Sequence, residues 1–362
     1  MELSDIIVQK IKDTGPVSFR DFMDICLYYP ELGYYTSANN KIGATGDYYT
    51  SACLTPAFGA TIGRQLEEMW RILGSKSFTI VEYGAGTGFL CHDILDYLKN
   101  NEELYDKLHY CIIEKSAAMR EKEKAHLHEK VSWYDSIKDI PINIDCILSN
   151  ELVDNFPVHQ VVMKDELMEV FVDYDNGFTE LLVPAKKALS NYLNELSVQL
   201  PRGFRTEINL AATEWIKEIA ACIKKGFVIT IDYGYTSTDM YRPYRSEGTL
   251  VCYNKHKAGD EFYKNAGSQD ITAHVNFSAL MHWGEKNGLA CCGCTSQANF
   301  LLACGFIDFF MKEMESVQCT PENYKRAAFL KHTLLVNMGS KFKVLIQCKG
   351  LNAPPLLGLS LS

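Results

Sequence analysis

The sequence contains no run of about 18 apolar residues, the length that a helix needs to cross a bilayer. It also lacks an excess of positive charge: its formal net charge is −9, which gives no electrostatic footprint for nonspecific binding to nucleic acid. The N-terminal segment lacks the apolar core of a secretory signal and contains early acids, unlike an Arg-rich transit peptide. These absences predict a cytoplasmic protein that neither inserts into a membrane nor binds nucleic acid.

The cysteines show no regular spacing, although there are 13 of them. A disulfide framework is therefore not indicated, and the reduced thiols of a cytosolic enzyme are expected. Cys291, Cys292 and Cys294 cluster, but no second Cys/His pair lies at zinc-finger distance, so we expect no metal site. Internal repeats and low-complexity linkers are absent too. At 362 residues and 47% hydrophobic, the chain has the material for one large domain or two.

A glycine-rich turn stands between a strand-like segment and a helix-like segment. The apolar, β-branched residues at 78–81 predict a buried strand, and apolar residues recur at helical spacing over 90–98. Between them lie Gly84, Gly86 and Gly88, where the missing Cβ permits positive φ and a close approach to a ligand. This order is typical of the nucleotide crevice in a doubly wound sheet, although an ordinary βα turn shows the same pattern.

The spacing of these glycines bears on the ligand. A dinucleotide fingerprint, G-x-G-x-x-G/A, has a small third residue, but Phe89 occupies that place and disfavours NAD. Glu82 stands two residues before the first glycine, which gives the form acidic-x-G-x-G-x-G. This form resembles the motif of class I S-adenosylmethionine-dependent methyltransferases. The resemblance implies that the backbone of this turn cradles the amino-acid part of that cofactor. The cofactor-binding candidates here are Glu82, Gly84, Ala85, Gly86 and Gly88.

Polar residues follow three further strand-like segments. Glu114 ends the first of them, and its carboxylate can accept both ribose hydroxyls of a nucleoside. Asp135 ends the second and can accept from an adenine amino group, while Asn150, Glu151 and Asp154 follow the third. Because ligands of open α/β sheets bind outside the carboxyl ends of the strands, this regularity favours a nucleotide-type cofactor. The three segments are 110–114, 131–135 and 145–149.

The order of these segments predicts an α/β fold of the class I methyltransferase type. We expect a Rossmann-like, mostly parallel sheet with helices on both faces, an N-terminal helical extension and inserted cap elements. The predicted parts are a helical and lid region over 1–75, a Rossmann-like domain over 76–350 with insertions at about 158–183 and 235–288, and a tail over 351–362. The first insertion reads as a hairpin, and residues 235–275 show no regular period.

Several separated signatures, taken together, make the chain similar to the MidA-like family of S-adenosylmethionine-dependent methyltransferases over about residues 15–349. That family includes a mitochondrial complex I assembly factor with protein-arginine methyltransferase activity. The signatures are PELGYY at 30–35, GDYYT at 46–50, VEYGAGTG at 81–88, NELVDNFP at 150–157, DYGY at 232–235, GTL at 248–250, GSQDIT at 267–272 and MGSKFK at 338–343. The family's usual Asn-Glu-Phe-Phe-Asp-Ala-Leu-Pro differs at four apolar or small positions here, so the polar chemistry is kept while the pocket shape changes.

The resemblance implies S-adenosylmethionine as cofactor, a protein substrate that is a respiratory complex I subunit, and a homodimer. It also places Gly46 with the cofactor-binding residues and Asp47 beside the cofactor. Methyl transfer from a sulfonium is an in-line displacement that depends mainly on positioning in a dry site. Carboxylates can hold the planar fork of a guanidinium acceptor, so Glu151, Asp154 and Asp47 are the catalytic candidates.

The same acids are compatible with ordinary loop capping, and three functions stay open at this point. They are a protein-arginine methyltransferase, a methyltransferase for a small molecule, and a catalytically idle assembly factor that binds S-adenosylmethionine. His159 and His274 are expected to be structural, because this chemistry does not require a histidine base. The aromatic segments 28–35 and 46–51 fit either a packed loop or a lid that excludes water from a cleft.

Overall fold

The computed structural model describes residues 2–37, 50–127, 129–254, 257–315, 318 and 320–361. The chain divides into two compact units, each built from several segments. We call Tyr49–Leu152, Ile216–Tyr233 and Trp283–Ser362 the sheet unit, and Met1–Tyr48, Val153–Trp215 and Gly234–His282 the insert unit. Each unit is described by itself. The predicted Gly46 and Asp47 lie outside the described residues.

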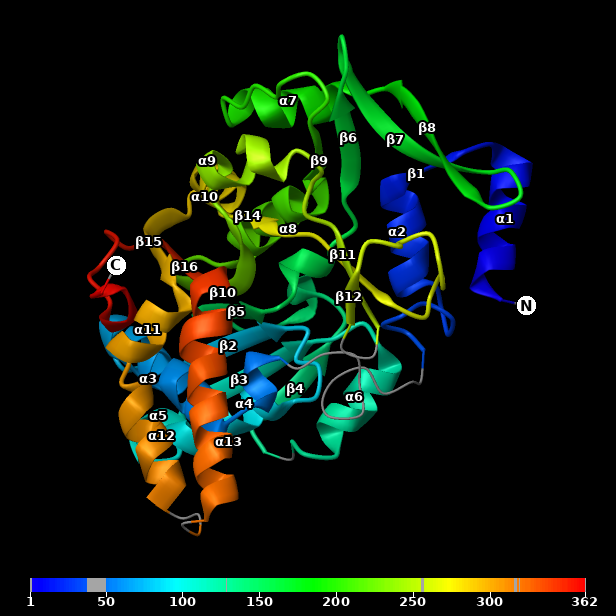
Figure 1. Cartoon of the computed structure of the whole chain (residues 1–362). Helices are drawn as coiled ribbons and strands as arrows, with labels where there is room; N and C mark the ends of the chain where they lie inside the picture. The colour runs from blue at the N-terminus through cyan, green and yellow to red at the C-terminus, as the bar shows by residue number, and fades with distance from the viewer. Residues whose placement is uncertain are drawn as a thin grey trace. The chain divides into compact units, whose positions relative to one another are not determined.

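The sheet unit is built around a mostly parallel sheet with the order β15-β16-β10-β5-β2-β3-β4 (Figure 1). Its strands are β2 (Phe78–Tyr83), β3 (Leu108–Ile113), β4 (Val131–Tyr134), β5 (Cys146–Asn150), β10 (Gly226–Tyr235), β15 (Ala290–Ser296) and β16 (Phe342–Lys349). The central strands pair in parallel, and β16 runs antiparallel to both β10 and β15. Parallel strands buried on both faces are continuous apolar runs, which is how the sequence revealed them. The predicted fold class is confirmed.

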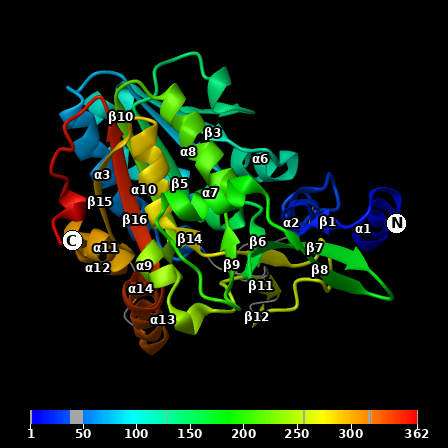
Figure 2. The ribbon, with the colours of Figure 1, turned by 90° about the horizontal axis from the view of Figure 1, so that it is seen from above.

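Helices cover both faces of this sheet (Figure 2). The helices that lie wholly in this unit are α3 (Pro56–Ile72), α4 (Phe89–Leu98), α5 (Glu102–Asp106), α6 (Ala117–Lys124), α11 (Gln297–Ala303), α12 (Phe306–Glu315), α13 (Pro321–His332) and α14 (Met338–Lys341), while α8 (Leu210–Cys222) and α10 (Phe277–Lys286) each have residues in both units. The longest, α3, begins at Pro56 because proline fits the first helical position, and the Thr55 side chain caps it by accepting from the Ala57 N–H. Its buried stripe, which includes Phe58, Ile62 and Leu66, joins the core cluster that also contains residues of β2 and β3.

The insert unit holds a five-stranded antiparallel sheet, and the hairpin predicted at 158–183 is part of it. Its elements are α1 (Leu3–Thr14), β1 (Val17–Ser18), α2 (Phe19–Tyr28), β6 (His159–Met163), β7 (Leu167–Tyr174), β8 (Phe178–Pro184), α7 (Lys187–Glu195), β9 (Arg205–Ile208) and α9 (Ser237–Met240). The order is β1-β7-β6-β9, with β8 paired to β7. The predicted hairpin is the β7–β8 pair; β1 and β6 also pair with β7, and β9 pairs with β6. Such long-range partners leave no local signal in the sequence.

The sequence of residues 235–275 shows no regular period, yet the segment contains a small antiparallel sheet. Its strands are β11 (Val251–Asn254), β12 (Lys257–Gly259) and β13 (Asp270–Thr272), in the order β12-β11-β13. Each strand has only three or four residues, which is too short for an alternating pattern to stand out. A further short strand, β14 (Val275–Asn276), pairs in parallel with the end of β10.

Two absences hold for the part of the chain that the structure describes. None of its helices is both long and apolar enough to cross a membrane. Within the same residues, no group of three or more His, Cys, Asp or Glu side chains is arranged to hold a metal ion.

Candidate functional site

The glycine turn joins β2 to α4 through three residues in the left-handed region. Gly84, Gly86 and Gly88 have φ values of 65°, 60° and 78°, a conformation that is strained for residues with a Cβ. There is little room for a Cβ as well, since one at Gly84 would lie 3.0 Å from Leu152 Cδ1 and one at Gly88 would lie 3.2 Å from Leu127 Cδ1. The turn therefore needs glycine, and it presents bare backbone at the carboxyl end of β2.

Glu82, at the end of β2, lies beneath this turn. Its side chain is buried, with the residue only 2% exposed, and it accepts a hydrogen bond of 2.7 Å from the Tyr110 hydroxyl. Burial raises the pKa of Glu82 to about 7, against the lowering effect of that hydrogen bond. The carboxyl group thus joins β2 to β3 inside the protein.

Glu114 and Asp135 follow β3 and β4, as predicted, and one arginine connects them. The Glu114 Oε1 accepts from the Ser116 N–H at 2.7 Å, and burial raises the pKa of this carboxyl group. Arg120 on α6 donates to the Glu114 carbonyl at 2.7 Å, to the Tyr134 carbonyl at 3.1 Å and to Asp135 Oδ1 at 2.5 Å. It therefore ties the ends of two strands together. Sequence analysis missed Arg120, because it stands among other charged residues on a short polar helix.

Glu151 stands just past β5 in an unusual backbone conformation. Its φ is 52°, in the left-handed region, which costs a residue with a side chain about 1–3 kcal/mol. The Glu151 N–H donates to the Ile231 carbonyl at 2.9 Å, and Glu151 Oε1 accepts from the Ser51 N–H at 3.0 Å and from Asn150 Nδ2 at 3.3 Å. The next N–H, of Leu152, donates to Asp232 Oδ2 at 3.2 Å. Strain of this kind is common at functional sites, and at Glu151 it coincides with the carboxyl end of a parallel strand.

Asp154 belongs to the insert unit, and its surroundings unite several of the sequence signatures. It is buried in η3 (Val153–Asn155), and its carbonyl accepts from the Ala273 N–H at 3.0 Å. The Tyr35 hydroxyl lies 2.7 Å from Asn155 Oδ1 and 2.9 Å from both carboxylate oxygens of Asp270. Its single proton goes to Asp270, because a carboxylate is the stronger acceptor. The signatures at 30–35 and 267–272 and the part of the third signature over 153–157 therefore meet within this unit.

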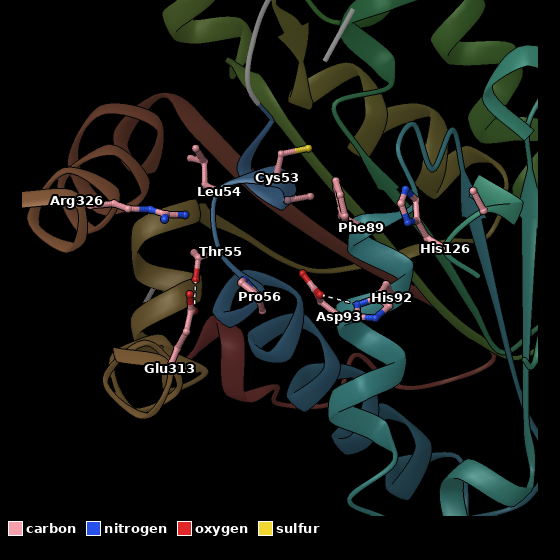
Figure 3. Close-up of a pocket in the computed structure, with 12 residues that line it drawn as sticks. Cys53, Leu54, Thr55, Pro56, Phe89, His92, Asp93, His126, Glu313 and Arg326 are labelled. Atoms are coloured by element: carbon pink, nitrogen blue, oxygen red, sulfur yellow. Dashed lines mark hydrogen bonds and ion pairs between the residues drawn. The ribbon is translucent and has the colours of Figure 1, made fainter. Parts of the chain in front are cut away.

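The sheet unit also contains a pocket of about 550 Å³ at the amino end of α4 (Figure 3). Phe89 and His126 stack on one wall with ring centroids 5.3 Å apart, and Arg326 points in from α13 on the other side. Cys53, from η1 (Ser51–Cys53), lies 3.5 Å from the Thr87 hydroxyl of the glycine turn. The pocket is thus next to the turn, and sequence analysis did not predict it, because its walls come from five separate segments.

The comparisons with known proteins agree with this geometry. A family model of S-adenosyl-L-methionine-dependent methyltransferases matches residues 61–295. The chain belongs to this family. S-adenosylmethionine is therefore its cofactor, as predicted.

Individual relatives span almost the whole chain. A Drosophila melanogaster protein named protein arginine methyltransferase NDUFAF7 homolog, mitochondrial, is 28% identical and the alignment covers 97% of this chain and 87% of the fly protein. The human protein arginine methyltransferase NDUFAF7, mitochondrial, is 27% identical, with 93% of this chain and 81% of the human protein covered. A crystal structure from Burkholderia thailandensis, bound to S-adenosyl-homocysteine, has a TM-score of 0.86 and 28% identity and covers 99% of this chain and 94% of that one.

Two inferences from the sequence need correction. The predicted cytoplasmic location is wrong by this comparison, since the curated relatives are mitochondrial proteins. The choice of S-adenosylmethionine is confirmed, but the bulk of Phe89 at the third position of the fingerprint is not a valid reason for disfavouring NAD. Phe89 is 42% exposed and its ring lies on the pocket wall, so it does not obstruct packing between α4 and the sheet.

The residues at the turn fit the cofactor of the family. The three glycines present bare backbone in the left-handed region at the carboxyl end of β2, where a ligand can approach the main chain closely. Asn150 Oδ1, at the end of β5, is buried and makes no hydrogen bond to the residues that the structure describes. A buried acceptor of this kind requires a donor, and a bound amino group or hydroxyl can supply one.

Replacing Glu114 by alanine tests its predicted contact with the ribose. We expect Glu114→Ala to weaken S-adenosylmethionine binding by about 1–3 kcal/mol, because the ribose hydroxyls lose their acceptor. Calorimetric titration measures the change, and circular dichroism checks the fold. Asp106→Ala, at an exposed helix end in the same unit, is the matched control. An unchanged affinity in a folded Glu114→Ala variant would remove this residue from the site.

Proposed function

We propose that this methyltransferase transfers its methyl group to an arginine side chain of a protein substrate. The supporting observation is Glu151, a carboxylate held on a strained backbone at the carboxyl end of β5. A guanidinium needs such a group, because two of its N–H bonds can point to the two oxygens of a fixed carboxylate. The relatives named protein arginine methyltransferases span more than nine-tenths of the chain and support the same acceptor.

The transfer step requires a nitrogen lone pair in line with the carbon–sulfur bond. The guanidinium nitrogen forms a bond to the methyl carbon while the carbon–sulfur bond breaks, and the sulfonium becomes a neutral thioether. The nitrogen loses one proton to water, so the methylated guanidinium keeps a single positive charge. In our proposal Glu151 orients the guanidinium, and Asp154 and Asp47 supply further negative charge in the acceptor site.

The cofactor contacts belong to the same proposal. We assign the glycine turn, together with Glu82, Ala85 and Gly46, to binding of the cofactor. Glu114 takes the ribose, Asp135 the adenine and Asn150 the region near the sulfur. Arg120 holds the ends of β3 and β4 in place for the ribose and adenine contacts.

The pocket beside α4 favours a second candidate, a small-molecule acceptor. Its volume of about 550 Å³ lies within the range of small-molecule sites. We place this alternative second, because none of the acidic residues kept from the family signature lines the pocket. For the protein substrate we retain a respiratory complex I subunit, and a homodimer stays a prediction.

Mass spectrometry of lysate proteins tests the choice of acceptor. The purified protein is incubated with lysate and S-adenosylmethionine that carries a deuterated methyl group. We expect labelled methylarginine in tryptic peptides, and a parallel incubation with Glu151→Gln should leave the label out. Label found only in the small-molecule fraction would favour the second candidate.

A further inference from the structure

Glu123 is a fully buried acid on the inner face of α6, close to the glycine turn. The residue is 0% exposed, and its Oε2 accepts from the Trp133 indole N–H at 2.7 Å. Its other oxygen, Oε1, is buried and has no hydrogen-bond partner among the described residues. A Cβ on Gly88 would lie 3.5 Å from the Glu123 Cα, so α6 packs directly against the last glycine of the turn. A buried carboxylate oxygen without a partner is costly, and a proton on it removes the charge.

Titratable groups on neighbouring elements shift the pKa of Glu123. Glu82 of β2, itself bonded to Tyr110 of β3, and Glu114 at the end of β3 both add negative charge. The thiol of Cys91 on α4 is neutral, because burial raises its pKa well above the usual value.

Among the residues that the structure describes, the positive charge that lowers the pKa of Glu123 is Arg120 of the same helix. The Arg120 guanidinium is engaged with Asp135, and the Lys124 ammonium lies 6.0 Å from the centroid of the Trp133 ring. Burial first, and the neighbouring Glu114 second, raise the pKa of Glu123 to about 8, so this acid is mostly protonated at neutral pH.

The cofactor and its product differ by one methyl group and one charge. S-adenosylmethionine carries a sulfonium cation, whereas S-adenosylhomocysteine has a neutral thioether at the same place. A negative charge near the site therefore favours the cofactor over the product. A unit charge about 10 Å from another, at an effective dielectric constant of about 20, changes an affinity roughly tenfold. An acid whose proton is easily lost can supply that charge when the cation arrives.

We propose that Glu123 is a specificity-determining residue that loses its proton when S-adenosylmethionine binds and so separates the cofactor from its product. This inference depends on the cofactor of the family and is independent of the arginine acceptor. The cation favours the ionised form of Glu123, and by linkage the affinity for S-adenosylmethionine rises as pH rises past the pKa of the free protein. The affinity for the neutral product stays nearly constant. After transfer the sulfur is uncharged, Glu123 regains its proton, and the product leaves more readily.

Calorimetric titration in buffers with different ionisation enthalpies counts the protons released on binding. At pH 7.5 we expect S-adenosylmethionine to release about half a proton more from the parent than from Glu123→Gln, since a tenfold affinity change moves the pKa by about one unit. The α-amino group of the ligand also titrates near this pH, but equally in both proteins. Glu121→Gln is the control, because Glu121 is on the same helix, its side chain is 74% exposed, and it forms an ion pair with Lys124.

The ratio of the affinities for S-adenosylmethionine and S-adenosylhomocysteine provides a second readout. In the parent, binding of S-adenosylmethionine relative to S-adenosylhomocysteine should improve several-fold between pH 6.5 and 9, and Glu121→Gln should follow the parent. Glu123→Gln should lack the part of this rise above about pH 7.5, where Glu123 titrates. Equal proton release and equal ratios in all three proteins would overturn the proposal and leave Glu123 a purely structural acid.

A second variant keeps the test decisive if Glu123→Gln does not fold. Trp133→Phe keeps the carboxyl group but removes the hydrogen bond that lowers its pKa. We expect the pH at which the affinity ratio rises to move upward in this variant. A ratio that rises at the same pH as in the parent would contradict the assignment to Glu123.

Discussion

Glu151→Gln is expected to lower turnover at least about a hundredfold while changing the affinity for S-adenosylmethionine by less than about threefold. Glutamine keeps the size of the side chain and an oxygen for the Ser51 N–H, so the local structure should persist. It removes the negative charge that the cationic acceptor requires, and loss of such electrostatic stabilisation typically costs 10²–10³ in rate. The backbone strain at this position is unchanged, because glutamine and glutamate are equally strained at a φ of 52°.

Single-turnover methyl transfer to the protein substrate measures the rate, and calorimetry measures the affinity for S-adenosylmethionine. Glu102→Gln is a matched control, since Glu102 is an exposed acid on α5 of the same unit. Should Glu151→Gln methylate its substrate as fast as the parent, Glu151 would be a structural acid. The proposed arginine acceptor would then lose its main support.

The central sheet could be predicted from the sequence because its strands carry their own signal. The strands β2, β3, β5 and β10 are buried on both faces and therefore consist of nearly continuous apolar residues. The polar residues at their carboxyl ends could be found in the same way, since each directly follows an apolar run. Glu82, Glu114 and Glu151 are all at the predicted strand ends, although their roles toward the ligand remain predictions.

The remaining features depend on contacts between distant segments. Arg120 and Glu123 lie in the stretch Ala-Ala-Met-Arg-Glu-Lys-Glu-Lys, whose many charges are typical of a solvated helix face. Only the fold shows that these two side chains face the sheet, where Arg120 reaches Asp135 and Glu123 reaches Trp133. The small sheet of β11, β12 and β13 could not be predicted for the same reason. Its strands are so short that only their pairing with one another defines them. The sequence-based division at residues 75 and 350 stays a prediction.

The cofactor-free protein is expected to lose stability as pH rises from about 5 to 9, and Glu123→Gln should remove much of that loss. The pKa of Glu123 rises from its usual value of 4.5 in an unfolded chain to about 8 in the folded protein. Between these values the folded state binds more protons than the unfolded state, so the free energy of unfolding falls as pH increases. One pKa unit corresponds to about 1.4 kcal/mol, and the full shift to roughly 3–5 kcal/mol.

Thermal unfolding followed by circular dichroism between pH 5 and 9 measures this effect without any ligand. Near pH 5 the parent and Glu123→Gln should be similar, because the amide and the protonated acid are both neutral and both can accept from Trp133. Toward pH 9 the variant should become the more stable protein, while Glu121→Gln follows the parent throughout. Glu82, whose pKa is about 7, remains in both proteins. It causes a smaller loss of unfolding free energy, and this loss is complete at a lower pH. A stability difference between the parent and Glu123→Gln that does not change with pH would show that Glu123 keeps one protonation state over this range.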